Sequence, residues 1–123
     1  MYYNKNKKLG NEGEKIATKY LETIGYLIKE RNFKSKSGEI DIIAQKDDQI
    51  IFIEVKTRSS NNYGSGIEAI NKIKQKHILI TAAYYAFINH IEESNIQFDV
   101  IEILKKDKFY IKHTRNCEML ALV

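Results

Sequence analysis

The chain has 123 residues, of which 43% are hydrophobic and 29% charged, and this fits one globular domain with a single ordinary core. The composition excludes a disordered, collagen-like or repeat architecture, and the apolar runs are far shorter than the ~18 residues of a membrane span. The net charge of +4, from 20 basic and 16 acidic residues, slightly favours a polyanionic partner, although ordinary solvated lysines explain it as well.

The N-terminal residues and the cysteine content favour the cytoplasm. The first residues, MYYNKNKKLG, contain lysines but no apolar segment typical of a secretory signal. Cys117 is the single cysteine, so an intramolecular disulfide is excluded, and no cysteine or histidine pair has the spacing of a metal site. We therefore expect a cytoplasmic protein without a membrane partner.

The first predicted element is an amphipathic helix over residues 9–24, followed by Gly25 as its C-cap. At about 100° per residue, Glu14 falls beside Leu21 on the rim of the apolar stripe, while the other charged residues point away. Glu14 is thus the acid of this helix that lies nearest to whatever the helix covers. The stripe itself consists of Leu9, Ile16, Ala17, Tyr20, Leu21 and Ile24.

Three strand patterns follow the helix, over residues 26–33, 39–45 and 50–57. Asp47 and Asp48 have the turn chemistry expected between the second and third strands. A polar loop with two glycines then covers residues 58–66. A long helical pattern runs from residue 67 to residue 89, with a break expected near Asn71. Its core-facing stripe is predicted to comprise Ile70, Ile73, His77, Ile80, Tyr84 and Phe87.

Two further strands are predicted over residues 96–104 and 109–113, and the tail over residues 114–123 has no assignment. The order α-β-β-β-α-β-β indicates one α/β domain over residues 1–123, with a motif-bearing core over about residues 9–113. We expect a central mixed sheet flanked by helices.

The hairpin between the second and third strands places charges within an apolar segment, GEIDIIAQKDDQIIFIEVKTR. If Asp47 and Asp48 are the two loop residues, paired residue numbers sum to 95, so Asp41 faces Glu54 and Glu39 faces Lys56. Side chains alternate along a strand, which puts these four on one face. The other face is expected to be the buried one, and it carries Ile40, Ile42, Ile51, Ile53 and Val55.

Directly opposed carboxylates destabilise a sheet unless a cation neutralises them, and Mg²⁺ binds through one or two carboxylates. Lys56 beside such an ion could orient a water molecule or stabilise negative charge at a phosphate, which suits metal-assisted phosphodiester hydrolysis. A sheet with one solvated face offers a simpler explanation, in which Glu39 and Lys56 form an ordinary cross-strand pair. A register slip of one residue would also separate Asp41 from Glu54.

The spacing of Asp41 and Glu54-Val55-Lys56 resembles the PD-(D/E)XK signature of restriction-endonuclease-like nucleases. Over residues 9–104 the chain closely resembles the YraN-like family of small bacterial proteins. The matching segments are GNEGEKIATKYLETIGYLIKERNF, GEIDIIA, IFIEVKTR, AIN…KQ and FDVI. This resemblance implies a restriction-endonuclease-like core (α-β-β-β-α-β), similar in outline to archaeal Holliday-junction resolvases. The proline of the signature is missing, since Ile40 precedes Asp41.

The resemblance implies roles for particular residues. Asp41 and Glu54 become metal-binding acids, Lys56 the catalytic lysine, and Glu14 the acid that completes the site from the first helix. The carbonyl group of Val55 becomes a further ligand. Lys74 and Gln75 match a helix position that approaches the scissile phosphate. Together with Arg58 they are the expected nucleic-acid contacts. An exposed helix face explains Lys74 and Gln75 equally well.

These expectations describe a Mg²⁺- or Mn²⁺-dependent DNA endonuclease selective for branched or damaged DNA, because no base-reading element is visible. An adaptor that binds nucleic acid without efficient turnover, and a nuclease that acts on RNA, both fit the same residues. Asp99 is interpreted as structural support and His77 as a core or boundary histidine. The pair Tyr84-Tyr85 has one ring outside the core stripe, which leaves a homodimer open.

Overall fold

The computed structural model describes residues 5–59 and 66–119. The elements follow the predicted order, with boundaries shifted by a few residues. They are α1 (Lys5–Thr23), β1 (Leu27–Ser35), β2 (Gly38–Lys46), β3 (Gln49–Arg58), the 3₁₀ turn η1 (Gly66–Ala69), α2 (Lys72–Ile88), the 3₁₀ turn η2 (Glu93–Asn95), β4 (Ile96–Lys105) and β5 (Phe109–Thr114).

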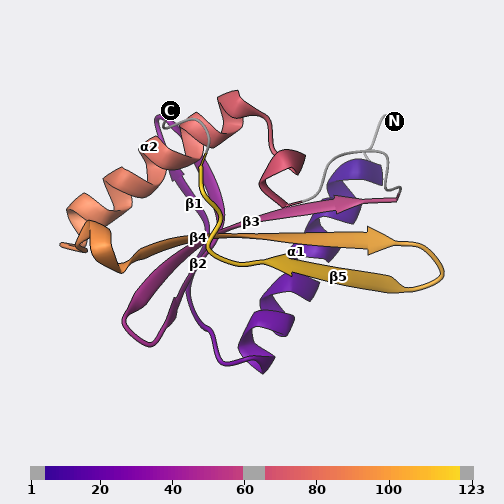
Figure 1. Cartoon of the computed structure of the whole chain (residues 1–123). Helices are drawn as coiled ribbons and strands as arrows, with labels where there is room; N and C mark the ends of the chain where they lie inside the picture. Colours follow the sequence, from indigo (N-terminus) through magenta and orange to yellow (C-terminus); the bar gives the residue numbers. More distant parts are fainter. Residues whose placement is uncertain (1–4, 60–65, 120–123) are drawn as a thin grey trace.

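The five strands form one mixed sheet in the order β1-β2-β3-β4-β5 (Figure 1). Neighbouring strands are antiparallel except β3 and β4, which are parallel. Parallel neighbours cannot be joined by a tight turn, and here η1 and α2 provide the crossover. The two long helices cover opposite faces, so the fold is a mixed α/β structure with a five-stranded sheet between two helices.

The predicted register of the β2–β3 hairpin is confirmed over the pairs from Ile42–Ile53 to Lys46–Gln49, whose residue numbers all sum to 95. Asp47 adopts the left-handed conformation (φ 55°) that a two-residue hairpin turn requires. The turn residues therefore set which hairpin side chains share a face.

Both faces of the sheet are buried, so the prediction of a single buried face was incomplete. Under α1 the core contains Ala17, Leu21, Tyr26, Ile42, Ala44, Ile51, Ile53, Ile101 and Ile103. Under α2 it contains Ile40, Ile43, Phe52, Ile70, Ile78, Ala82, Tyr85, Val100 and Met119. The face of the hairpin that carries Asp41 and Glu54 thus lies beneath α2, which leaves Asp41 partly buried and Glu54 buried, whereas Glu39 is exposed.

The prediction that the side chains of Ile40 and Ile42 lie on the same face of the hairpin is wrong, because Ile40 packs under α2 while Ile42 packs under α1. The alternation of side chains fails at the residue between them, Asp41. The β2–β3 ladder ends at Ile42, and on the other side of β2 the neighbouring strand carries Asn32 in the left-handed conformation (φ 55°). An irregularity on both sides of Asp41 turns the start of β2 toward α2.

Both helix boundaries have a local cause. At the end of α1, Gly25 has φ 96°, and the N–H of Tyr26 donates to the carbonyl of Leu21 at 2.9 Å, which is a Schellman cap. The predicted break near Asn71 is confirmed, since the Asn71 side chain accepts the N–H of Lys74 at 2.8 Å and starts α2 as its N-cap.

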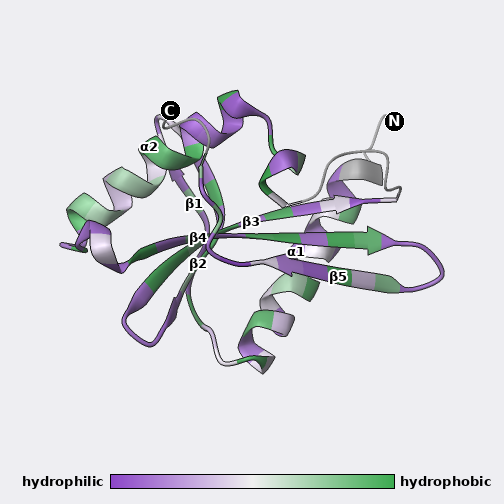
Figure 2. Ribbon diagram, viewed as in Figure 1, coloured by the Kyte–Doolittle hydropathy of each residue, from purple (hydrophilic) through white to green (hydrophobic). Residues whose placement is uncertain are grey.

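The predicted core-facing stripe of the second helix is wrong. α2 buries Gln75, Ile78, Thr81, Ala82, Tyr85 and Ala86. Of the predicted stripe, Ile70 is buried just before α2 begins, whereas Ile73, His77, Ile80, Tyr84 and Phe87 are exposed. The buried face includes the polar residues Gln75 and Thr81 beside small alanines, so apolar periodicity selected the opposite face. In Figure 2 the C-terminal half of α2 is accordingly green to white on all sides.

The predicted loop over residues 58–66 lies mostly outside the described residues, as do residues 120–123 of the tail. The described part of the tail joins the core through Met119, and the N–H of Cys117 donates to the carbonyl of Phe98 at 2.6 Å. Within residues 5–59 and 66–119, no helix has both the length and the apolar character needed to cross a membrane.

Candidate functional site

Asp41 marks the point where β2 and β3 separate. Beyond the last ladder pair, Ile42–Ile53, the Oδ2 atom of Asp41 accepts the backbone N–H of Val55 at 2.8 Å. A side chain thus satisfies a backbone group that the ladder no longer pairs. This contact keeps the Asp41 carboxyl group next to Glu54, as the predicted register required.

Glu54 is a buried acid, only 4% exposed, and it forms an ion pair with Lys74 from α2. Burial raises the pKa of Glu54 to about 8; repulsion by Asp41 adds to this rise and the attraction of Lys74 opposes it. Burial lowers the pKa of Lys74, but the attraction of Glu54 and its hydrogen bond, together with the charges of Asp41 and Glu39, outweigh that effect and hold the pKa above its ordinary value. Positive charge is therefore strongly favoured at this position.

Glu14 reaches the same region from α1. Its Oε1 atom lies 3.6 Å from the guanidinium of Arg31. With the Asn32 amide oriented so that its nitrogen faces acceptors, that nitrogen donates to Oε1 of Glu14 at 3.1 Å and to Oε1 of Glu39 at 2.9 Å. Burial and then the charge of Asp41 raise the pKa of Glu14, while Arg31 lowers it. Glu14 therefore contacts the β1 residues beneath its helix, on the side that helix geometry predicts.

Gly13 allows α1 to approach β3 closely enough to bring Glu14 there. A Cβ atom added at Gly13 would stand 1.9 Å from Thr57 Oγ1 and 3.0 Å from Thr57 Cβ. No side chain fits in that space, so the glycine sets the distance between the helix and the strand. The adjacent residue, Glu14, is positioned by this contact.

Lys56 lies on β3 two residues beyond Glu54, and its side chain is exposed. In the described parts of the chain it forms no ion pair with Glu39, so that predicted cross-strand pair is absent. The reason is that Glu39 lies beyond the end of the β2–β3 ladder, so no backbone pairing holds it opposite Lys56. Val55 is half-buried, and its N–H is the group bound by Asp41.

The side chains of Arg58 and Gln75, which the sequence predicts as nucleic-acid contacts, are engaged within the fold. Arg58 forms an ion pair with Glu102, whose Oε1 accepts the N–H of Gly66 at 2.6 Å. Gln75 is buried, and its amide donates to the carbonyl of Ile70 at 2.8 Å. Both side chains stabilise the crossover between β3 and α2. Lys74, in contrast, is half-exposed at the site.

A cavity of about 400 Å³ opens beside these groups, with a lining of Gly38, Glu39, Asp41, Asn71, Ile73, Lys74, His77 and Ile78. Carboxylate oxygens are the donors that Mg²⁺ and Mn²⁺ prefer, so the chemistry of the acids fits such an ion. Across the described residues, however, no three Asp, Glu, His or Cys side chains converge closely enough to hold one. The positive charge beside Glu54 is that of Lys74.

Comparison with known proteins assigns the chain to a family. The model of the uncharacterised protein family UPF0102 matches residues 13–103, which contain every predicted site residue from Glu14 to Gln75. The chain belongs to the UPF0102 family. A UPF0102 protein of Clostridioides difficile is 44% identical over 111 residues, which cover 90% of this chain and 96% of the relative. A UPF0102 protein of Clostridium perfringens is 49% identical over 80% of this chain and 80% of the relative. A UPF0102 protein of Persephonella marina is 41% identical over 85% of this chain and 90% of the relative.

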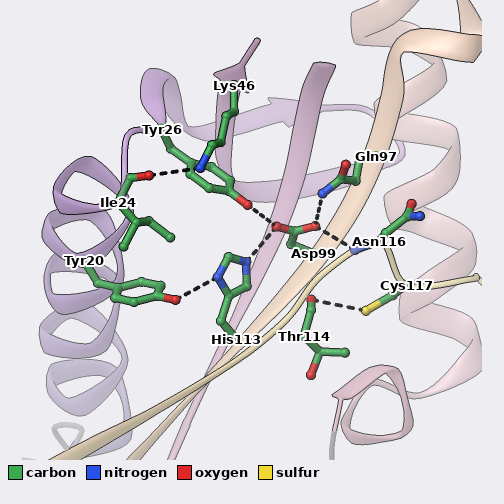
Figure 3. A network of polar contacts seen from close by, with 10 residues as sticks. All are labelled: Tyr20, Ile24, Tyr26, Lys46, Gln97, Asp99, His113, Thr114, Asn116 and Cys117. Carbon is green, nitrogen blue, oxygen red and sulfur yellow. Dashed lines mark hydrogen bonds and ion pairs between the residues drawn. The ribbon is translucent and has the colours of Figure 1, made fainter. Parts of the chain in front are cut away.

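A second polar cluster of this UPF0102 chain lies on the α1 side of the sheet and is centred on Asp99 (Figure 3). Oδ2 of Asp99 lies 2.7 Å from His113 Nε2 and accepts the hydroxyl of Tyr26 at 3.0 Å. Oδ1 accepts the amide of Gln97 at 2.9 Å and the N–H of Asn116 at 3.0 Å. His113 Nδ1 is 3.0 Å from the Tyr20 hydroxyl, so the cluster joins α1 to the sheet.

The sequence predicts structural support as the role of Asp99, and its place in this cluster agrees with that interpretation. The partnership with His113 was missed, because 14 residues separate the two and nothing in either segment indicates the pairing. The signal that could have found it is the β4–β5 register, where Ile101 pairs with His113 and Asp99 lies two residues away on the same face.

Replacing Asp99 by Asn in this UPF0102 chain is expected to lower the free energy of unfolding by about 2–4 kcal/mol, because it weakens several buried hydrogen bonds at once. Burial raises the pKa of Asp99, but hydrogen bonds from His113, Gln97 and Asn116 outweigh it and hold the pKa below the ordinary value of 3.8. The stabilisation is therefore complete above that value and is lost as the pH falls through the lower pKa of the folded state.

Urea unfolding at neutral and at acid pH measures both effects. The difference between wild type and Asp99→Asn should shrink in acid. The control is Asp107→Asn, since Asp107 is exposed and accepts a single hydrogen bond from Tyr110. Equal stability of wild type and Asp99→Asn at neutral pH would contradict this prediction.

Proposed function

We propose that this UPF0102 chain is a divalent-metal-dependent nuclease that hydrolyses phosphodiester bonds, with DNA as its substrate. The observation that carries the proposal is the pairing of Asp41 with the buried Glu54 at the point where β2 and β3 separate. Glu14 arrives there from α1 and Lys56 follows on β3. Buried acids that repel one another weaken a fold, and such arrangements are typical of sites that bind a cation or substrate.

The order of the helices and strands supports the same proposal. A helix, a three-stranded antiparallel meander, a second helix and a parallel fourth strand follow one another in the order expected of a restriction-endonuclease-like core. Asp41 and Glu54, the acids to which the resemblance gives metal binding, stand where β2 and β3 separate. Fold resemblance alone does not establish activity, so the residues of the site carry the argument.

In this proposal Glu14, Asp41 and Glu54, with the carbonyl group of Val55, would hold Mg²⁺ or Mn²⁺, and the three acids would have to draw closer together than they lie in the described structure. The bound ion would supply a Lewis acid that polarises a phosphate oxygen and makes water a stronger nucleophile. Lys56 then stabilises the negative charge that builds up on the phosphate as the water oxygen bonds to phosphorus and the bond to the leaving sugar oxygen breaks. The leaving oxygen takes up a proton. Lys74 must first release Glu54, and it then faces the phosphate.

The net charge of +4 supports a polyanionic substrate, since Lys and Arg side chains near phosphates release bound counterions. Lys34 and Lys36 at the β1–β2 turn and Lys72 and Lys76 on α2 are exposed on the elements that carry the site. None of these elements presents a recognition helix or other base-reading device, so the proposed selectivity is for DNA structure, such as branches or damage.

The test is a cleavage assay on linear, nicked, flapped and four-way DNA, and on the corresponding RNA, with Mn²⁺ present. Cleavage should fall by about 10²-fold or more in Asp41→Asn and in Lys56→Ala, because each removes a charge that acts on the reacting phosphate. Asp48→Asn and Lys106→Ala change exposed residues away from the acids and are matched controls.

Wild type that binds DNA without cutting any substrate would reject the enzyme proposal in favour of a nucleic-acid-binding adaptor. Cleavage confined to the RNA substrates would reject DNA as the substrate. Cleavage that persists in both site variants would show that the activity comes from a contaminant or from other residues.

A further inference from the structure

The solvent-facing side of α2 carries large apolar side chains that remain exposed to solvent, although the ring of Tyr84 also stacks on Phe33 of β1 with the centroids 6.3 Å apart. Phe87 is 80% exposed and Ile73 is 72% exposed, and Ile80, Tyr84 and Ile88 are also exposed. They lie opposite the face that packs on the sheet. Contiguous exposed apolar side chains of this size are unusual on a monomer and typically mark an interaction surface.

These side chains follow the spacing of a helix that packs against another helix. Ile73, His77, Ile80, Tyr84 and Phe87, here called the outer stripe, recur at alternating steps of four and three residues. That spacing keeps one seam facing a neighbouring helix over the whole length of α2. The occupant that fits the outer stripe is therefore another helix with a matching pattern.

We infer that the outer stripe binds the outer stripe of a second copy of this chain, with the two α2 helices antiparallel about a two-fold axis at Ile80. In this arrangement the residue numbers of facing positions sum to 160. Ile73 then faces Phe87 of the other copy, Ile80 faces itself, and Lys76 faces the ring of Tyr84, a favourable cation–π pairing. Ile73, Ile80 and Phe87 thus pair within the stripe, while His77 faces Ala83 of the other copy.

The size of the stripe is sufficient for such a dimer. An aromatic side chain offers about 150–250 Å² when fully exposed, so the exposed apolar side chains of α2 provide roughly 500 Å² per copy. Two copies thus bury roughly 1,000 Å² before the flanking polar residues are counted, which is the lower limit for a specific interface.

The charges around α2 favour the antiparallel arrangement. The first half of the helix carries Lys72, Lys74 and Lys76, and α2 contains no acidic residue. The exposed acids Glu92 and Glu93 follow soon after its end. An antiparallel pair brings the basic start of one helix toward the acidic segment after the other, whereas a parallel pair would place the two sets of lysines together.

The dimer would extend to the candidate site. Ile73 and His77 belong to the outer stripe and also line the cavity that contains Asp41 and Lys74. Phe87 of the second copy, which faces Ile73, would therefore form part of the wall at the cavity mouth. At 1.5 Å per residue the two cavities would lie roughly 20 Å apart along the helix pair, open to one continuous substrate.

Sedimentation equilibrium of the full chain over a wide concentration range tests the association. Wild type should have twice the mass of 14.4 kDa, and Ile80→Glu should weaken dimerisation at least about thirtyfold, because two carboxylates would meet at the axis. Leu27→Glu changes an exposed apolar residue on β1 and should remain dimeric. Circular dichroism would establish that Ile80→Glu is folded, as an exposed position should allow.

Cross-linking tests the orientation, in chains that carry Cys117→Ser. Ile80→Cys should form an intermolecular disulfide on oxidation, whereas Ile73→Cys should not, because the two copies of residue 73 lie roughly 20 Å apart in the antiparallel pair. The proposal is overturned by a monomeric wild type, by a dimer that survives Ile80→Glu, or by cross-linking of Ile73→Cys instead of Ile80→Cys. It does not depend on the proposed nuclease function, which the cleavage assay tests separately.

Discussion

Glu54→Gln should melt at a higher temperature than wild type without metal, and should gain no stability from Mn²⁺. The first effect follows from removing a buried negative charge that faces Asp41, whose repulsion and burial raise the pKa of Glu54 to about 8. Gln has the same shape and keeps hydrogen-bonding capacity, so the expected gain is about 1–2 kcal/mol, or a few degrees in melting temperature. The second follows because an amide is a much weaker ligand for a hard cation than a carboxylate.

The pH dependence gives an independent readout of the same residue. The folded state holds the Glu54 proton up to about pH 8, whereas the unfolded chain releases it near the ordinary value of 4.5. The folded state thus binds more protons between these two values, so wild-type stability should fall as the pH rises across that window. Glu54→Gln lacks this contribution and should show a flatter profile.

The measurement is thermal unfolding across this pH range, with and without Mn²⁺. A ligand present at about 100 times its dissociation constant stabilises the native state by about 2.7 kcal/mol, which is readily detected in wild type. Glu22→Gln, on the exposed side of α1, is the control and should retain the Mn²⁺ response. An equal response in Glu54→Gln would remove Glu54 from the proposed ligands.

Gly13→Ala is expected to destabilise the protein strongly, although alanine normally stabilises a helix. The new Cβ atom would lie 1.9 Å from Thr57 Oγ1, so α1 must move away from β3 or the side chain of Thr57 must be displaced. Overpacking of this kind costs about 1–3 kcal/mol and occasionally more, and here it acts next to Glu14. Mn²⁺ stabilisation and any cleavage should therefore decline together with stability.

The chain contains a matched control, because Gly10 lies in the same helix and a Cβ atom added there would have nothing within 4 Å. Gly10→Ala should stabilise the protein by about 0.5–1 kcal/mol through helix propensity alone. Adding Thr57→Ala to Gly13→Ala should recover part of the lost stability, since it removes two of the three clashing atoms, Oγ1 and Cγ2. A neutral Gly13→Ala would show that the close approach has no role in placing Glu14.

The parts of the fold that could be predicted from the sequence are those with a local cause. The Asp47-Asp48 turn determines the hairpin register, and thereby the meeting of Asp41 and Glu54. The position of Glu14 follows from helix geometry, and the break before α2 follows from the capping chemistry of Asn71. Each of these depends on residues within a few positions of one another.

The parts that were missed depend on contacts between distant segments. The pairing of Lys74 with Glu54 requires the packing of α2 on the sheet, and that of Asp99 with His113 requires the β4–β5 register. The orientation of α2 was wrong because its buried face contains Gln75 and Thr81, whose polar groups find partners inside. Hydrophobicity alone could not identify that face.

The candidate site draws its side chains from both cores, and this has a consequence for folding. Glu14 depends on the docking of α1 on one face of the sheet, and Lys74 on the docking of α2 on the other. Sixty positions along the chain separate them, so they come together only through long-range contacts, which form slowly. A chain emerging from synthesis, or one that has locally opened at either helix, would have an incomplete site, which links any activity to completion of the tertiary structure.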